Sequence, residues 1–117
     1  MSTAKEQPQE LVRGAGNNPL ITASTVLGRK WHPTIVRQLL EVGPQGFSDL
    51  KTQIDGISGK VLSESLTDLE EQGIAERRVL ETKPVRVEYS LTSTGRELQG
   101  VIEELDRWGR VYQSSEP

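Results

Sequence analysis

Apolar residues recur at three- and four-residue steps through much of the chain, which is the spacing that predicts amphipathic helices. The clearest case is the segment from Ser58 to Gln72. Its apolar stripe consists of Leu62, Leu66 and Leu69. Ser58 is a good N-cap, because its hydroxyl can accept a hydrogen bond from a free amide in the first turn. Gly73 follows and is expected to end the helix in a left-handed conformation.

The opposite face of this helix is polar from its first turn onward. The side chains on that face are short or charged: Lys60, Ser63, Glu64 and Thr67. Two interpretations are open for it. It is either the solvated face of an ordinary amphipathic helix, or a face that enters a DNA major groove by its N-terminal end. The segments on either side favour the second interpretation.

Three shorter helices are predicted before this one. Pro19 opens the first, which ends at Gly28. The second runs from about Trp31 to Val42, with Pro33 tolerated in its first turn. The third runs from about Ser48, its expected cap, to Ile54, and Asp55-Gly56 follows as a turn signal. A short helix, a turn and a longer helix form a helix-turn-helix pattern, with the segment 58–72 in the recognition position.

Two strand-like segments follow, Ile74 to Leu80 and Arg86 to Leu91, the second with the alternation of a half-buried strand. The turn-forming stretch 81–84 lies between them, so a β-hairpin is predicted directly after the recognition helix. Such a hairpin is a wing. Lys83 and Arg86 near its tip are candidates for the phosphate backbone or the minor groove, and the alternative for both is solvated turn charge. A weak further strand is possible near Gly46-Phe47.

A last helix is predicted from about Thr94 to Tyr112, with Thr94 and Glu97 forming a capping box. Its apolar stripe is Leu98, Val101, Ile102, Leu105, Trp108 and Tyr112. That is more apolar surface than a lone C-terminal helix on a small domain needs to bury. The helix therefore packs either on its own domain or on a partner subunit, together with the first helix.

The 117 residues predict one domain with a modest core, since 33% are hydrophobic and 4% aromatic. Residues 1–18 are expected to form a flexible arm, residues 19–112 the domain, and residues 113–117 a frayed tail. No apolar run is long enough to cross a membrane, and the N-terminus has no apolar signal core, so a cytoplasmic protein is expected.

Composition argues against an enzyme. The chain has one histidine, His32, and no cysteine, so it lacks a thiol nucleophile and an obvious metal site, and we expect no metal or cofactor. The net charge of −3 argues mildly against nucleic acid, whose partners are usually basic. Only the docking face has to be positive, however, so overall charge does not exclude DNA binding.

Taken together, these elements predict a mainly α fold with a small β-hairpin wing, an α+β winged helix-turn-helix. The chain resembles the HxlR family of winged-helix transcriptional regulators, within the MarR-like group. The resemblance is carried by the following residues: Gly28-Arg29-Lys30-Trp31, Phe47-Ser48-Asp49-Leu50, Ile57-Ser58-Gly59-Lys60, Leu62, Leu66, Leu69, Glu70, Arg86 to Thr92, Gly95 and Trp108-Gly109. It spans Pro19 to Gly109.

The resemblance implies a homodimeric regulator of transcription that binds double-stranded DNA. The expected DNA-binding residues are Ser58, Gly59, Lys60, Ser63, Glu64, Thr67, Lys83, Arg86, Arg29 and Lys30. The expected dimer interface is Leu20, Ala23, Leu27, Leu98, Val101, Ile102, Leu105, Trp108 and Tyr112.

Many members of the family carry a cysteine just before the proline that opens the first helix, and here that position is Asn18. A thiol switch is therefore not available to this chain. Regulation would have to come from a non-covalent small-molecule effector, a partner or the protein's own abundance. The alternative function is a winged-helix module that binds protein and has no specific DNA binding.

Overall fold

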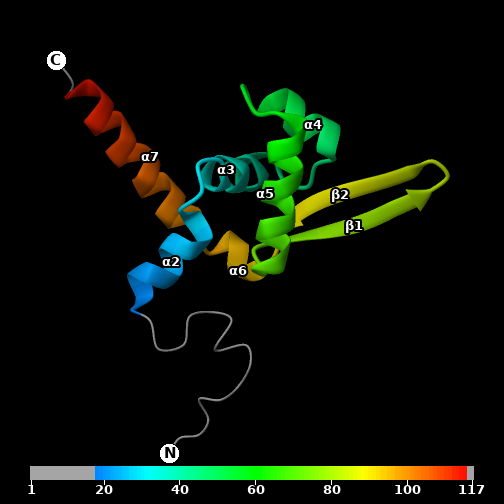
Figure 1. Ribbon diagram of the computed structural model, residues 1–117, viewed down its shortest axis with the longest axis horizontal. Coiled ribbons are helices and arrows are strands. Elements are labelled where there is room, and N and C mark those ends of the chain that lie inside the picture. The colour runs from blue at the N-terminus through cyan, green and yellow to red at the C-terminus, as the bar shows by residue number, and fades with distance from the viewer. Residues whose placement is uncertain (1–17, 116–117) are drawn as a thin grey trace, which may run out of the picture.

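The computed structural model describes residues 18–115, which form a helical body with a long hairpin projecting from it (Figure 1). The order of elements is α2 (Pro19–Leu27), α3 (His32–Val42), α4 (Phe47–Gln53), α5 (Gly59–Glu71), β1 (Ala75–Thr82), β2 (Val85–Leu91), α6 (Ser93–Arg96) and α7 (Gln99–Ser114). The hairpin and α7 extend in different directions from the body. The predicted winged helix-turn-helix is confirmed.

The core forms where α5 packs against α3 and α4. Leu62, Leu66 and Leu69 are buried there, as the spacing predicted. Their neighbours in the core are Ile35, Val36, Leu39, Leu50, Ile54 and Ile57. Each fully buried aliphatic side chain contributes about 1.5–3 kcal/mol. The predicted ends of α5 are also confirmed, since Ser58 caps it and Gly73 follows with φ of 76°.

The short helix α4 begins one residue earlier than predicted. Its N-cap is Gly46, so Ser48 lies inside the helix and the prediction that Ser48 caps it is wrong. Phe47 takes the first helical position because its side chain packs against the core. The arm predicted for residues 1–18 lies outside the described residues except for Asn18. The Asn18 Oδ1 atom accepts a hydrogen bond of 2.9 Å from the Ile21 amide and so caps α2.

Strands β1 and β2 pair antiparallel and form the predicted wing, with the irregularity of a bulge between Val79 and Glu81. The third strand contact that the sequence placed near Gly46-Phe47 is an isolated bridge at Gln45, whose backbone exchanges hydrogen bonds of 2.8 and 2.9 Å with Tyr89. The buried Gln45 side chain also bonds to Gln53 in α4 and Gln38 in α3. This cluster fixes the base of the wing to the helix-turn-helix.

The predicted single C-terminal helix is two helices. Thr92, not Thr94, is the N-cap of α6, and its Oγ1 atom accepts from the Gly95 amide at 3.0 Å. The chain then tightens, because the Leu98 amide bonds to the Gly95 carbonyl three residues back, before α7 begins at Gln99. Thr92 Oγ1 also lies 2.7 Å from the Gly73 carbonyl, which ties α6 to the end of α5. The predicted Thr94–Glu97 capping box is therefore wrong.

Helix α7 continues to Ser114, so the frayed tail predicted from Gln113 starts later than expected. Within the described range 18–115, no helix has both the length and the apolarity needed to cross a membrane.

Gly95 is the position where α6 packs most closely on the start of the hairpin. A Cβ atom there would lie 2.2 Å from the Ile74 carbonyl oxygen. We expect Gly95→Ala to lower the free energy of unfolding by about 1–3 kcal/mol, because backbone has to move to admit the methyl group. Thermal unfolding followed by circular dichroism measures this change.

Gly100→Ala is the matched control, since a Cβ atom at Gly100 in α7 meets nothing within 4 Å. It should leave stability unchanged or raise it by up to about 1 kcal/mol through helix propensity. Equal melting temperatures for the two variants would contradict the packing argument.

Candidate nucleic-acid interface

Helix α5 presents a polar face to solvent on the side opposite its buried leucines. Lys60, Ser63, Glu64 and Thr67 are all exposed on this face. The Ser58 hydroxyl accepts a hydrogen bond of 3.1 Å from the Val61 amide, and the first turn contains no acidic residue. The helix dipole therefore leaves positive potential at this end. An exposed, positive helix start with short side chains suits a phosphate backbone and base edges.

A second cation lies beside this helix start, and the sequence analysis missed it. The aliphatic part of the Lys51 side chain, in the last turn of α4, covers Gly59, since a Cβ atom on Gly59 would lie 3.6 Å from Lys51 Cε. Lys51 and Lys60 therefore both belong to the region around the start of α5. The signal in the sequence was the place of Lys51, at the end of the helix that leads into the recognition helix.

The wing carries more positive charge than the two predicted residues. Arg86 and Lys83 are exposed as expected, and Lys83 lies in the turn at the outer end of the hairpin (Figure 1). Arg77 and Arg78 in β1 are exposed as well. Arg86 has Glu81 opposite it in the strand register, and Arg78 lies 4.0 Å from Glu76, so carboxylates offset part of this charge.

Arg29 and Lys30 are not gathered with Lys60. Arg29 pairs with Asp68 at 3.4 Å, which is eight residues beyond Lys60 and so about 12 Å along the helix axis at 1.5 Å per residue. The Lys30 ammonium lies 5.4 Å from the centre of the Trp31 ring. Trp31 itself packs against the core, which is the preferred of its two interpretations. Both cations therefore face the C-terminal half of α5 or the start of α3 rather than the first turn of α5.

The predicted dimer residues separate into exposed and buried groups. Leu20, Ala23, Val101, Leu105, Trp108 and Tyr112 are exposed. Leu27 and Leu98 are half-buried against the chain's own core. Ile102 is only 5% exposed, so its assignment to a partner surface is wrong: it packs in the core because the α3 side of α7 needs an apolar residue there. Ile21 and Val111 are exposed beside this set and were missed.

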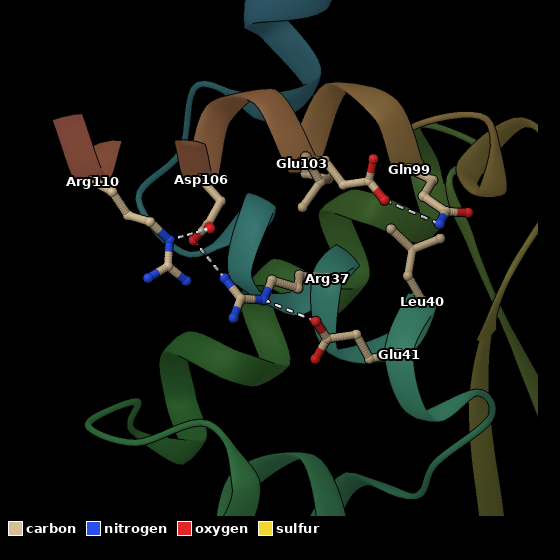
Figure 2. Close-up of a pocket in the computed structure, with 8 residues that line it drawn as sticks. Arg37, Leu40, Glu41, Gln99, Glu103, Asp106 and Arg110 are labelled. Carbon is tan, nitrogen blue, oxygen red and sulfur yellow. Dashed lines mark hydrogen bonds and ion pairs between the residues drawn. The ribbon is translucent and has the colours of Figure 1, made fainter. Parts of the chain in front are cut away.

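A cleft of about 340 Å³ lies between α3 and α7 (Figure 2). Its charged groups bind one another: Asp106 lies 2.8 Å from both Arg37 and Arg110, and Arg37 lies 3.2 Å from Glu41. The hydrogen bond from Arg110, with the charges of Arg110 and Arg37, holds the Asp106 pKa below its usual value in spite of some desolvation. The cleft thus joins α7 to the domain rather than offering unpaired charge to an effector.

The sequence matches the HxlR-like helix-turn-helix family over residues 26–117. The chain belongs to this family and is a DNA-binding helix-turn-helix transcriptional regulator. Among its curated relatives is an uncharacterized HTH-type transcriptional regulator of Bacillus subtilis, YvaP, 42% identical over 90 residues, which are 77% of this chain and 82% of YvaP. Another is YodB of the same organism, 40% identical over 91 residues, which are 78% of this chain and 80% of YodB.

Solved structures agree with the fold. The reduced form of YodB from B. subtilis matches with a TM-score of 0.72 and 35% identity, covering 86% of this chain and 97% of that one. The putative HTH-type regulator ytcD matches with a TM-score of 0.75 and 32% identity, covering 83% and 98%. YodB is also known in quinone-bound and diamide-treated forms. This chain contains no cysteine, so thiol chemistry cannot act on it.

Ser58→Asp tests whether the start of α5 faces DNA. Aspartate caps a helix about as well as serine, so the stability of the fold should stay within about 0.5 kcal/mol of wild type. The added carboxylate would meet phosphate at the interface, so DNA affinity should fall sharply at low salt. Fluorescence anisotropy with labelled DNA measures the affinity.

Ser93→Asp makes the same chemical change at the first residue of α6 and should leave affinity unchanged. If Ser58→Asp binds DNA as tightly as wild type, the start of α5 does not lie against DNA.

Proposed function

We propose that this regulator acts as a homodimer that reads an inverted-repeat operator with two copies of α5. The observation that carries this proposal is the exposed polar face at the start of α5, held outward by the buried leucines behind it. Two copies related by a twofold axis would require half-sites about one helical turn, roughly 10 bp, apart or a multiple of it.

The side chains of α5 fit different parts of such a site. Lys60 is suited to a guanine edge or an adjacent phosphate, because it is the exposed cation nearest the helix start. Ser63 and Thr67 are short enough for the backbone to come close to DNA. Glu64 can accept from a cytosine amino group or repel other sequences. Arg86 on the wing is suited to a phosphate or the minor groove, and Lys51 extends the positive surface.

An unpartnered apolar stripe on α7 supports the dimer. Val101, Leu105, Trp108 and Tyr112 follow one another at helical spacing, each between 44 and 59% exposed. The Trp108 and Tyr112 rings stack with their centres 5.0 Å apart, which makes one broad aromatic surface. Leu20 and Ile21 of α2 are 79% and 51% exposed. Exposed apolar surface of this kind marks an interaction site, and a second copy of the chain has the same surface to offer.

Val101→Asp combined with Leu105→Asp should split the dimer, because a twofold interface repeats each substitution and would then bring together four new carboxylates. We expect a dimer for wild type and a monomer for the variant at micromolar concentration. Sedimentation velocity measures both, and circular dichroism reports whether the variant remains folded.

Arg107→Asp is the control on the polar side of α7, where it removes only the exposed ion pair with Glu104, an interaction worth little. It should remain dimeric. A wild-type protein that sediments as a monomer would rule out the proposed assembly.

Lys60→Ala and Arg86→Ala should weaken DNA binding in different ways. If Lys60 reads a base, its loss costs about 1–3 kcal/mol per half-site and relaxes the preference at one position. If Arg86 contacts phosphate, its loss weakens all sequences alike and makes the salt dependence shallower by about one unit per contact. Binding measured across a salt series on cognate and scrambled DNA separates the two effects.

Arg107→Ala is the control for loss of a cation and should change neither affinity nor salt dependence, since Arg107 lies on α7. Wild-type affinity in both interface variants would show that the docking face is elsewhere. No retardation of genomic DNA fragments by the wild type, even at low salt, would favour a protein-interaction module instead.

A further inference from the structure

Helix α2 is attached to the rest of the protomer by few contacts. None of its nine residues is buried, and only Val26 and Leu27 near its end pack against the core. The carbonyls of its last turn have no partners within the helix, as at any helix end. The contacts that these carbonyls make therefore decide how firmly α2 is held.

Two side chains from other helices bind the last turn of α2. The Gln72 Nε2 atom, at the end of α5, donates to the Thr25 carbonyl at 3.3 Å. The His32 Nδ1 atom, at the start of α3, lies 2.8 Å from the Val26 carbonyl. Because Gln72 directly follows the recognition helix, the end of α2 is joined to α5 as well as to α3.

His32 is the only polar side chain among the largest fully buried ones, with 1% of its surface exposed. A carbonyl oxygen only accepts, so His32 Nδ1 must carry a proton to bond with Val26. In the neutral ring, Nε2 is then a bare acceptor. It lies 3.7 Å from the Asp68 Oδ2 atom, and among the described residues no group donates to it. In that state two acceptors face each other in a buried site.

A second proton on His32 removes this mismatch. The imidazolium would donate to Val26 from Nδ1 and to Asp68 from Nε2, so that one ring bridges α2 and α5. Burial opposes a charged ring, and the Asp68 carboxylate and the negative end of α2 offset that cost. Arg29 is the other charged group at this carboxylate, at 3.4 Å, and α2 has no ionisable side chain.

We propose that His32 is a positioning residue that couples α2 to the recognition helix in a proton-dependent manner, the protonated ring holding the two helices together. This inference rests on the proposed function, in which α2 contributes Leu20 and Ile21 to the dimer surface and α5 reads DNA. Protonation fixes the angle between those two surfaces and thereby favours simultaneous binding to both half-sites. Histidine is the side chain whose charge changes near neutral pH, so DNA binding responds to mild acidification.

DNA affinity measured at about pH 6 and pH 8 tests the coupling. We expect wild type to bind roughly threefold to tenfold more tightly at the lower pH, which is the effect of about one hydrogen bond. Asp68→Asn places an amide donor opposite the bare Nε2 atom, so the bridge is complete with a neutral ring and the affinity should no longer depend on pH. Glu104→Gln removes one exposed carboxylate on α7 and should keep the wild-type dependence.

His32→Asn is a second variant with a flat expected profile, because its amide can donate to the Val26 carbonyl and takes up no proton. It serves also if Asp68→Asn fails to fold. A pH dependence equal to that of wild type in either folded variant overturns the inference and leaves DNA binding intact.

The protein has a single histidine, so its ring signals can be observed by NMR in a tag-free sample without assignment. At high pH the ring should be the Nδ1–H tautomer, and its protonation midpoint in the DNA complex should coincide with the change in affinity. An Nε2–H tautomer, or a midpoint unrelated to the affinity change, overturns the coupling. Should wild type bind no DNA at any pH, the proposed function fails. The tautomer of the free protein then still tests the arrangement of His32.

Discussion

The packing of the α5 leucines against α3 and α4 is the contact on which the rest of the structure depends. Leu62, Leu66 and Leu69 are buried on one side of the helix, so the other side is forced outward at a fixed angle. Burial of three such side chains contributes several kcal/mol, about 1.5–3 each, which is comparable with the total stability of a small domain. The recognition surface is therefore as rigid as the core behind it.

The same core orients the wing. The Gln45 bridge to Tyr89 and the Gln38–Gln45–Gln53 cluster join the base of the hairpin to α3 and α4. The wing consequently cannot rotate independently of α5 without breaking buried hydrogen bonds, which is costly. A protein with a net charge of −3 can thus hold its scattered cations on α5, α4 and the hairpin in one fixed arrangement, although carboxylates such as Glu81 reduce their long-range attraction for DNA.

Asn18 and His32 give this member of the HxlR-like family a different chemistry at the first helix. Asn18 caps the start of α2 with a side chain that cannot be oxidised to a disulfide, and His32 binds the carbonyl at its other end. Both ends of α2 are therefore held by hydrogen bonds from polar side chains. A helix held in this way responds to protons or to competing ligands rather than to oxidants.

The sequence by itself determined the order of helices and strands, the buried face of α5, its Ser58 cap and its glycine stop, because these follow from local spacing and backbone preference. It also found the exposed polar residues of α5, since the face opposite a leucine stripe has to be solvated. It did not find the break between α6 and α7, since the apolar spacing continues across it from Leu98 to Ile102. Only the close approach of Gly95 to the Ile74 carbonyl decides that break.

Tertiary structure also decided which side chains of distant segments meet. Ile102 belongs to the core, Lys51 lies beside Gly59, and Arg29 binds Asp68 instead of joining Lys60. His32 was a lone histidine in the sequence, and its position between Val26 and Asp68 becomes visible only after α2, α3 and α5 have packed. The physical reason is common to all of these: periodicity fixes the face of a helix on which a residue lies, whereas the partner opposite that face is set by how the helices cross.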